Sequence, residues 1–468
     1  MSQFSSRQRN ALAIILASYL LILLDTSIVI TGLPEIQASL GFSQVGLSWV
    51  QNAYTLAFGS LLLLGARAGD LFGRKNVFMW AIACFALASF IIGLTQSTSV
   101  MIAARAAQGA SAAVLAPATL SLLSTYFSEG EERVRALSLY GATAGIGATL
   151  GLVLGGMFAG WLSWRVGFFV NIPVCVVLFF AARFLLEESE PESGKLDVMG
   201  AIYSTFGMAC LIYGIIEGGE LGWQQTIPWG FLGMALLSLM IFVANEARHQ
   251  APLMPLRLFS DFERTSAYLA RMTFVGAMVS FFFFSTQFMQ HVLNYSPVEA
   301  GLGFVPMTAF TFISATWVPK VTRIIGNKWV VMGAFALLIL GLWLLSHLNA
   351  GAEYFADLLL PMMIIGLGNG AALGPLTVSG VKGVAAKDAG AASGVVNTAH
   401  QLGGTIGLSV LVVIFASAKD PSLDPTSAWA GQISVGYLGC VVMLVVGLLI
   451  LLASALNSNM RQRKMASV

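Results

Sequence analysis

The stretch ALAIILASYLLILLDTSIVIT, residues 11–31, contains one charged residue, Asp25, among twenty-one. At about 1.5 Å per residue, a helix of this length matches the ~30 Å hydrocarbon core of a bilayer, which indicates a membrane-spanning helix. An acid buried in such a span costs at least ~2.5 kcal/mol on insertion scales and is usually kept for a function. The alternative is a surface carboxylate near the helix end, since Pro34 and Glu35 mark the outer boundary. We predict that Asp25 is functional.

The composition of the chain excludes a soluble globular protein. Of its 468 residues, 57% are hydrophobic and 10% are charged, and the mean hydropathy is +0.82, values outside the range of soluble domains. The 49 glycines suit closely packed transmembrane helices, and the alternating segments of about ten residues that are typical of an outer-membrane barrel are absent. The four cysteines lie in apolar runs without metal-ligand spacing. We predict an all-α polytopic membrane protein with no metal site and no cofactor.

Polar breaks cut the chain into fourteen candidate spans. Lys and Arg residues test this count, because they collect on the cytoplasmic side of a membrane. Of the 24 Lys and Arg residues, all except Arg105, Arg165 and Lys419 lie in alternate loops or at the termini. In this count, Arg264 and Arg271 are assigned to the loop after the eighth span. Both termini are therefore predicted to lie in the cytoplasm. The protein itself is predicted to lie in the cytoplasmic (inner) membrane. The predicted spans are 11–33, 47–66, 77–95, 99–127, 134–160, 165–186, 196–217, 227–246, 264–290, 298–321, 329–348, 354–378, 391–416 and 433–456.

Two segments of the chain are similar to each other. GRKNVFMWA begins at Gly73, GNKWVVMGA begins at Gly326, and both follow the second predicted span of their half. A repeat of this kind predicts two parallel six-helix bundles with a substrate site between them. Two extra spans separate the bundles. The predicted organisation is an N-terminal bundle at 1–190, two linking transmembrane helices at 191–250 and a C-terminal bundle at 251–468.

The loop GARAGDLFGRK, residues 65–75, holds three glycines, one acid and three bases. Glycines permit tight turns and close helix approach, and the acid can pair with a base or cap a helix. The loop resembles the signature loop of the major facilitator superfamily, G-x-L-x-D-r-x-G-r-k, which implies a conformational latch between the halves. The alternative, a solvated charge cluster that sets topology, explains the bases but not the spacing of the glycines and the acid. The matching residues are Gly65, Asp70, Gly73, Arg74 and Lys75.

Two further segments resemble motifs of the fourteen-helix drug:proton antiporters of that superfamily. They are LDTSIVITGLP at residues 24–34 and RAAQGASAA at residues 105–113. An arginine inside a span is nearly as costly as an acid, so Arg105 and Asp25 together indicate mutual compensation or a proton relay. The alternative is that Arg105 lies near the outer end of its helix and extends its charge to the interface.

The glycine-rich segment GATAGIGATLGLVLGGMFAG, residues 141–160, resembles the fifth-helix motif of these antiporters, G-x-x-x-G-P-x-x-G-G. Glycine at this density also favours a close-packing helix face. Leu152 stands where the family usually has proline, which removes an expected kink and leaves exchange as the transport mode open. The matching residues are Gly147, Gly151, Gly155 and Gly156.

The segments WLSWRVGFFVNIPV, residues 161–174, and VVNTAHQLGGTIG, residues 395–407, are similar to the sixth- and thirteenth-helix motifs. His400 lies in the second of them, and a lone histidine in a span is more often a packing residue than a proton carrier. Aromatic and amide side chains around a central cavity suit flat lipophilic substrates, including cations. The predicted substrate-binding residues are Trp49, Asn52, Tyr54, Gln108, Phe284, Gln287, Asn397 and Gln401.

The resemblance covers Asp25 to Gly407 and implies a proton-coupled antiporter that exports lipophilic, cationic drugs across the cytoplasmic membrane. The resemblance further implies that Asp25 takes up a proton outside and releases it inside, under the influence of the Arg105 charge. The implied partners are a small lipophilic substrate, protons and membrane lipid, not nucleic acid, and one chain is expected to work as a monomer driven by the proton gradient. A uniporter or an exporter of anionic metabolites or peptides has the same fold, and a non-transporting sensor is a further alternative. The sequence contains no phosphate-binding loop or nucleophile constellation, so we do not expect an enzyme.

Overall fold

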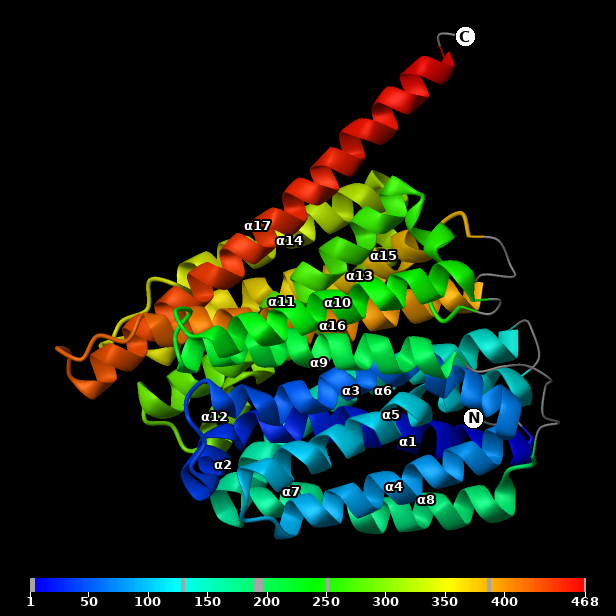
Figure 1. The fold of residues 1–468 in the computed structure, drawn as a ribbon, viewed down its shortest axis with the longest axis horizontal. Coiled ribbons are helices and arrows are strands. Elements are labelled where there is room, and N and C mark those ends of the chain that lie inside the picture. The colour runs from blue at the N-terminus through cyan, green and yellow to red at the C-terminus, as the bar shows by residue number, and fades with distance from the viewer. Residues whose placement is uncertain (1–4, 128–130, 189–196, 250–251, 385–388, 467–468) are drawn as a thin grey trace. The chain divides into compact units, whose positions relative to one another are not determined.

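The computed structural model describes residues 5–127, 131–188, 197–249, 252–384 and 389–466, and every regular element within these ranges is a helix (Figure 1). The prediction of an all-α protein is confirmed. The first elements are α1 Ser6–Thr31, α2 Leu33–Leu40, η1 Gly46–Ser48, α3 Trp49–Phe72, α4 Arg74–Leu94, α5 Thr98–Tyr126, α6 Glu131–Trp161, α7 Trp164–Phe169 and α8 Asn171–Leu185. They are followed by α9 Val198–Glu220, α10 Thr226–Arg248, η2 Leu256–Phe259, α11 Phe262–His291, α12 Pro297–Gly303, α13 Val305–Ile325, α14 Asn327–Leu345, η3 Tyr354–Leu358, α15 Leu359–Val381, α16 Ala389–Ser417 and α17 Pro425–Ala466.

Twelve helical segments among the described residues are long and apolar enough to cross a membrane. The helices at the second and fifth predicted spans, α3 and α6, have 24 and 31 residues. Neither is among the twelve, and only Leu150–Trp161 of α6 qualifies as a shorter apolar helix. A multi-pass membrane protein is thus confirmed, and the count of fourteen spans stays a prediction.

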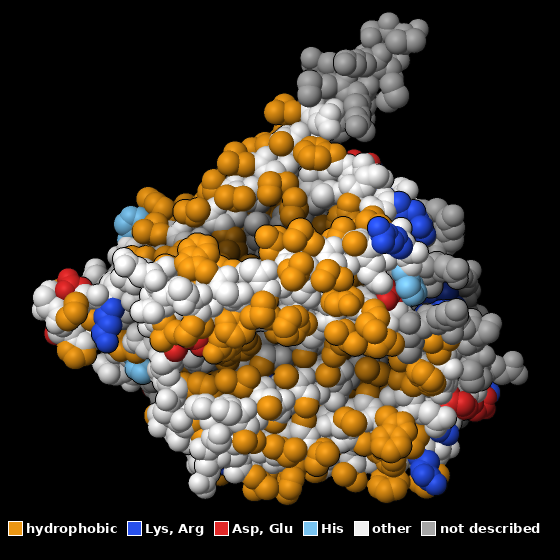
Figure 2. All heavy atoms as spheres, in the orientation of Figure 1, with side chains coloured by type: hydrophobic (Ala, Val, Ile, Leu, Met, Phe, Trp, Pro, Cys, Tyr) orange, Lys and Arg blue, Asp and Glu red, His pale blue; other side chains and the backbone are white. Residues whose placement is uncertain are grey.

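Apolar side chains lie on the outside of these helices as well as between them. Trp80, Phe184 and Ile324 are 73%, 75% and 82% exposed, and Figure 2 shows hydrophobic side chains over much of the visible surface. Most of the charged side chains visible there lie near the ends of helices. Apolar surface of this extent is typical of contact with lipid acyl chains.

The chain divides into two compact units. The N-terminal unit takes the described residues of Met1–Thr205, His249–Leu253 and Ser296–Leu302, and the C-terminal unit takes those of Phe206–Arg248, Met254–Tyr295 and Gly303–Val468. Most of α12 therefore belongs to the N-terminal unit, although it follows α11 in the chain. The predicted division at 1–190, 191–250 and 251–468 stays a prediction.

The first helix of the N-terminal unit, α1, has well-defined ends. Ser5 Oγ accepts a hydrogen bond from the N–H of Gln8, and Gln8 Oε1 accepts one from the N–H of Ser5, which together form a capping box. The helix ends at Thr31, and Pro34 lies in the first turn of α2. Asp25 is therefore an interior residue, about two turns from the C-terminal end of α1.

The repeat predicted from the sequence is visible in the backbone. Gly73 precedes α4 with a φ of +89°, and Gly326 precedes α14 with a φ of +87°. These values lie in a region that glycine adopts readily and other residues rarely adopt. The next residue in each copy bonds to the hydroxyl of a residue at the end of a neighbouring helix, Arg74 Nη1 to Thr125 Oγ1 at 2.8 Å and Asn327 Nδ2 to Ser379 Oγ at 2.9 Å. The two segments therefore form the same helix start in their respective units.

Candidate functional site

Asp25 and Arg105 form a buried ion pair within the N-terminal unit. Asp25 lies on α1 and Arg105 lies on α5, and each side chain is 1% exposed. Arg105 Nη1 donates a hydrogen bond of 2.8 Å to Asp25 Oδ2. Either charge alone is costly in a membrane interior, and the pair offsets part of that cost when its remaining donors and acceptors are satisfied. Neither side chain reaches the surface, contrary to the two alternatives raised by the sequence.

Two amide side chains and a hydroxyl complete the surroundings of Asp25. Gln108 Nε2 and Asn171 Nδ2 each donate a hydrogen bond of 2.7 Å to Asp25 Oδ1. Both amides also donate to Ser89 Oγ, at 2.8 Å and 3.3 Å, and Gln108 Oε1 accepts from Arg105 Nη1 at 2.7 Å. We call these five residues the Asp25 network. It joins α1, α4, α5 and α8, and it occupies both oxygens of the carboxylate.

The guanidinium of Arg105 is also held by α3 and α7. Its Nε donates a hydrogen bond of 2.9 Å to the carbonyl oxygen of Val50. Its Cζ lies 4.4 Å from the ring centroid of Tyr54 and 5.8 Å from that of Phe168, which places the cation over aromatic faces. The Tyr54 hydroxyl has no hydrogen-bond partner among the described residues. Several contacts of Arg105 are thus independent of Asp25.

The chemistry open to the Asp25 network is the exchange of one proton. The carboxylate of Asp25 is the group that can change charge, because a guanidinium stays protonated in proteins. Protonation of Asp25 weakens the bonds it accepts from Arg105, Gln108 and Asn171, so its charge state is connected to side chains on two other helices, α5 and α8. Within the described ranges, no group of three or more His, Cys, Asp or Glu side chains could hold a metal ion.

The predicted motif glycines of α6 determine how closely α1 lies against it. Gly147, Gly151 and Gly155 lie one helical turn apart and face α1. A Cβ atom on Gly155 would lie 2.4 Å from the carbonyl oxygen of Ile28, so the two backbones are in direct contact there. Gly156 faces α12 instead. The first three glycines therefore fix the position of the helix that carries Asp25.

Leu152 takes the place of the family's proline without a break in the helix. α6 is assigned as a single helix of 31 residues, and Leu152 is 2% exposed within it. Its carbonyl oxygen accepts a hydrogen bond of 3.3 Å from Thr31 Oγ1 on α1. This residue thus adds a further contact between α6 and α1.

The start of α4, in the loop at residues 65–75, contacts the end of α8 in the same unit. A Cβ atom on Gly73 would lie 2.6 Å from Glu188 Oε1. The Glu188 carboxylate accepts hydrogen bonds of 3.0 Å from the N–H groups of Lys75 and Asn76, a favourable place for a negative charge at a helix N-terminus. Lys75 Nζ donates to two carbonyl oxygens near the end of α8, at 2.8 Å and 2.7 Å. These contacts connect α4 and α8 at one end.

The other predicted residues of this loop contact α5. A Cβ atom on Gly65 would lie 2.4 Å from the carbonyl oxygen of Ala113, and Arg74 bonds to Thr125. The side chain of Asp70 lies outside the described part of the structure. All the contacts named here are within the N-terminal unit, and a latch between the halves stays a prediction.

The eight predicted substrate-binding residues are divided equally between the units. In the N-terminal unit, Asn52, Tyr54 and Gln108 are buried and Trp49 is half-buried; in the C-terminal unit, Phe284 and Gln287 are buried and Asn397 and Gln401 are half-buried. The structure places Gln108 in the Asp25 network and Tyr54 against Arg105. The role of these residues in substrate binding stays a prediction.

Phe284 and Gln287 lie on α11 in different surroundings. The ring of Phe284 packs on those of Phe415 and Tyr437, with centroid distances of 5.4 Å and 6.3 Å, and Gly436 leaves room for it. Gln287 is 2% exposed, and its Oε1 has no partner in the described ranges. Phe284 is thus part of the aromatic core of the C-terminal unit, whereas Gln287 has an unused acceptor.

Sequence reasoning did not single out Asn171, Ser89 and Arg271. Asn171 is the asparagine of the segment at residues 161–174, which is similar to the sixth-helix motif, so the motif was an available signal. Ser89 had no comparable signal, because serine is an ordinary packing residue in membrane helices. Arg271 was counted as a loop charge, and the structure corrects this, since Arg271 lies inside α11 and is 5% exposed.

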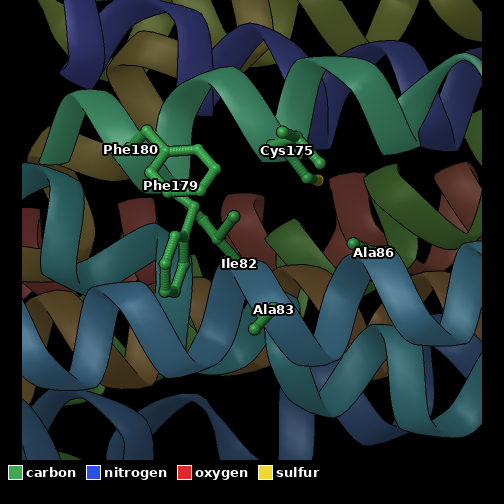
Figure 3. A pocket seen from close by; sticks show the side chains of 7 residues that line it. Ile82, Ala83, Ala86, Cys175, Phe179 and Phe180 are labelled. Atoms are coloured by element: carbon green, nitrogen blue, oxygen red, sulfur yellow. The ribbon is translucent and has the colours of Figure 1, made fainter. Parts of the chain in front are cut away.

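An apolar groove lies between α4 and α8 in the N-terminal unit. Figure 3 shows Cys175, Phe179 and Phe180 of α8 across from Ile82 and Ala83 of α4. The groove has a volume of about 210 Å³, and apolar side chains line it. This apolar lining suits an apolar occupant.

Comparisons with known sequences identify relatives over most of the chain. The family model for the Major Facilitator Superfamily matches residues 15–408. The cephamycin export protein CmcT of Amycolatopsis lactamdurans is 39% identical over 450 residues, which cover 95% of this chain and 92% of that protein. The puromycin resistance protein pur8 of Streptomyces alboniger is 35% identical over 455 residues, with 94% and 89% covered.

A comparison of structures gives the same fold. A bacterial homologue of the human lysosomal transporter Spinster, in an inward-facing and unoccupied conformation, superposes with a TM-score of 0.70. The alignment covers 97% of this chain and 98% of that chain, at 14% sequence identity. At this identity, the match supports the fold and carries no information on substrate.

Proposed function

Because this chain belongs to the major facilitator superfamily, and is therefore a multi-pass membrane transporter and not an enzyme, we propose that it exports lipophilic antibiotics and related toxic compounds in exchange for protons. The observation that carries the proposal is the buried Asp25–Arg105 pair. It combines a group that can exchange a proton with a fixed cation that responds to its charge. The names of the relatives support the export of antibiotics.

The proposed cycle uses Asp25 as the proton carrier. When Asp25 is charged, it accepts three hydrogen bonds, from Arg105, Gln108 and Asn171. When it is protonated, these bonds weaken, which changes the relative free energies of the conformations that expose the site to either side. A proton entering from outside and leaving inside then drives substrate outward. The transporter needs the proton gradient and no cofactor.

The substrate is proposed to be a small lipophilic compound. The sequence favours cations, because aromatic rings such as that of Tyr54 attract them. In the N-terminal unit, Arg105 already lies over the Tyr54 ring at 4.4 Å, and both oxygens of Asp25 accept hydrogen bonds. Export of cations through this unit therefore requires that the Asp25 network open.

The proposed location is the cytoplasmic (inner) membrane, with both termini in the cytoplasm and one chain as the working unit. The distribution of Lys and Arg residues supports this orientation. Two bundles in one chain support a monomer.

The test is ethidium efflux from cells that express the wild type, Asp25→Asn or Asp420→Asn, with and without a protonophore. Asp420 lies in the loop before α17 and is exposed, so its variant removes an acid outside the network. We expect efflux by the wild type and by Asp420→Asn, and none by Asp25→Asn or by uncoupled cells. Efflux by Asp25→Asn at the wild-type rate would falsify the proposed proton carrier.

The same experiment separates the other functions. Wild-type efflux that a protonophore leaves unchanged indicates a uniporter. A wild-type protein that binds ethidium in detergent but does not move it across a reconstituted vesicle membrane indicates a sensor. Proton release by the purified protein on addition of substrate supports antiport directly.

A further inference from the structure

Three helices of the C-terminal unit, α11, α15 and α16, meet around Arg271. A Cβ atom on Gly403 of α16 would lie 2.4 Å from Met272 Cα on α11, so the two backbones touch one residue beyond Arg271. On the side of α15, the Tyr268 hydroxyl donates a hydrogen bond of 2.8 Å to the carbonyl oxygen of Gly380. Arg271 is thus fixed among three helices, and it is 5% exposed.

Within the described residues, the guanidinium of Arg271 donates hydrogen bonds through Nη1. Nη1 donates to Thr377 Oγ1 at 2.7 Å and to the carbonyl oxygen of Leu373 at 3.5 Å. Nε is buried and has no partner in the part of the chain that the structure describes. The edge formed by Nε and Nη2 is the one that can receive both oxygens of a carboxylate side-on. Among the described residues, Nε of that edge has no acceptor, and the acceptors given for the guanidinium lie on Nη1.

A second polar side chain interacts with Arg271. His400 of α16 lies close enough to Arg271 for the two groups to interact electrostatically. Its Nδ1 is buried and has no partner within the described ranges. An imidazole nitrogen can donate a hydrogen bond, as a guanidinium does. Arg271 Nε and His400 Nδ1 are therefore two buried nitrogen atoms that the described protein groups leave unused.

Two other arginines show what a satisfied buried cation looks like in this chain. Arg264 lies on the same helix and is 8% exposed. It donates from Nε, Nη1 and Nη2 to three carbonyl oxygens, at 2.6 Å, 3.4 Å and 3.4 Å, and Arg105 pairs with Asp25. A buried cation that lacks such partners is costly, and within a membrane helix it marks a ligand or ion site.

We propose that Arg271, with His400 beside it, is an anion subsite that binds the carboxylate group of an exported organic acid. This assignment rests on the export function proposed above, but it does not depend on proton coupling. A carboxylate matches the free edge of Arg271, because its two oxygens can accept parallel hydrogen bonds from Nε and Nη2. The neighbouring imidazole can add a third donor. The transporter then accepts lipophilic acids, which are anions like the metabolites and peptides that the sequence left as an alternative.

The proposal is tested by the binding of tritiated 1-naphthaleneacetate and of its uncharged amide to the purified full chain, in a scintillation proximity assay. We expect the wild type to bind the acid at least ~10-fold more tightly than the amide, because charge-assisted hydrogen bonds are stronger than neutral ones. Arg271→Gln is expected to lower the affinity for the acid ~10- to 100-fold and that for the amide less than ~2-fold. Arg271→Lys keeps the charge but loses the flat edge, so its affinity for the acid is expected to lie between those of the wild type and Arg271→Gln.

Arg264→Gln is the matched control, because it removes the same charge from the same helix at a cation whose nitrogens already have acceptors. It should leave the ratio of acid to amide affinity unchanged. Equal losses for acid and amide in Arg271→Gln mean that Arg271 has a structural role only, and they overturn the proposal. If Arg271→Gln does not fold, His400→Gln gives the second test, with a loss of several-fold for the acid alone.

Competition distinguishes the possible sources of the anion. Inorganic phosphate or chloride that displaces the acid at equal concentration overturns the carboxylate assignment in favour of an inorganic ion. If the wild type binds the acid more tightly than Arg271→Gln in phosphatidylcholine nanodiscs but not in phosphatidylglycerol nanodiscs, the anionic headgroup competes for the site, and the site is assigned to a lipid headgroup. A wild type that exports ethidium but shows no preference for the acid overturns the subsite alone. A wild type that binds the acid through Arg271 but exports nothing overturns the export function alone.

Discussion

Arg105 and Arg271 are both arginines buried inside helices, and they differ in the groups that face the charge. Arg105 has a carboxylate of the same chain at 2.8 Å, whereas the partners of Arg271 among the described residues are a hydroxyl and a carbonyl group on one nitrogen. A cation that carries its own counter-ion can respond to a proton on that counter-ion. A cation without one must find its anion in what the protein binds. The two units thus contain related groups suited to different tasks, and four substitutions test this contrast.

The largest effect is expected from Arg105→Ala. It leaves the Asp25 carboxylate buried with amide donors only, so we expect a loss of ~3–5 kcal/mol in the free energy of unfolding, together with loss of export. A thiol-reactive dye can follow thermal unfolding, because Cys175, Cys210 and Cys440 are buried in the folded protein. The double variant Asp25→Asn/Arg105→Gln, which removes both charges, should recover part of the stability. A single variant as stable as the wild type contradicts the role of the pair.

Gly155→Ala tests whether the position of α1 matters as much as its charge. The added Cβ atom meets the carbonyl oxygen of Ile28 at 2.4 Å, so α1 and α6 must separate at a cost of ~1–3 kcal/mol. We expect weaker export in the ethidium assay and a lower unfolding temperature. Gly374→Ala on α15 is the control, because nothing lies within 4 Å of its added Cβ atom. Equal behaviour of the two variants would show that close packing around Asp25 is not required.

Asn171→Ala removes one of the three donors to Asp25 and leaves the ion pair in place. The expected loss in unfolding free energy is ~1–2 kcal/mol, the usual result when a buried charged acceptor loses one hydrogen bond. Export should persist, but its pH profile should shift. Ethidium efflux measured over a series of external pH values gives that profile. A pH profile identical to that of the wild type means that Asn171 only fills space.

The smallest change in stability is expected from Arg271→Met, and its sign is the opposite of that for Arg105→Ala. Methionine fills a similar volume without a charge, so removal of an uncompensated cation should leave the unfolding free energy unchanged or raise it by up to ~1 kcal/mol. Thermal unfolding with the same dye compares the two arginine variants directly. A destabilisation as large as that of Arg105→Ala would show that Arg271 has a counter-ion of its own.

The Asp25–Arg105 pair could be predicted because charged residues are rare in apolar spans. One acid among the twenty-one residues at 11–31 is conspicuous, and a second charge of opposite sign in another span suggests a partner. The glycines of α6 were equally readable, since their spacing of one turn gives a packing face. The rarity of charged residues in apolar spans and the periodic spacing of glycines are therefore the two sequence signals that agree with the structure.

Asn171, Ser89 and Arg271 could not be predicted in the same way. Amides and hydroxyls are common in membrane helices, so only the folded chain shows which of them face Asp25. Arg271 lies near the cytoplasmic end of a predicted span, where loop and helix charges look alike in sequence. Its burial depends on the contact of Gly403 with Met272, and those residues are 131 positions apart.

The contacts that hold Arg105 independently of Asp25 have an electrical consequence. Its Nε bonds to Val50 and its cation lies over the Tyr54 ring, so the guanidinium can keep its place when Asp25 takes up a proton. The buried centre then changes from neutral to a charge of plus one while its heavy atoms stay in place. A membrane potential of 100 mV acts on one charge with up to ~2.3 kcal/mol across the full bilayer. In the proposed cycle, the voltage and the pH difference would thus both act at one point of the N-terminal unit.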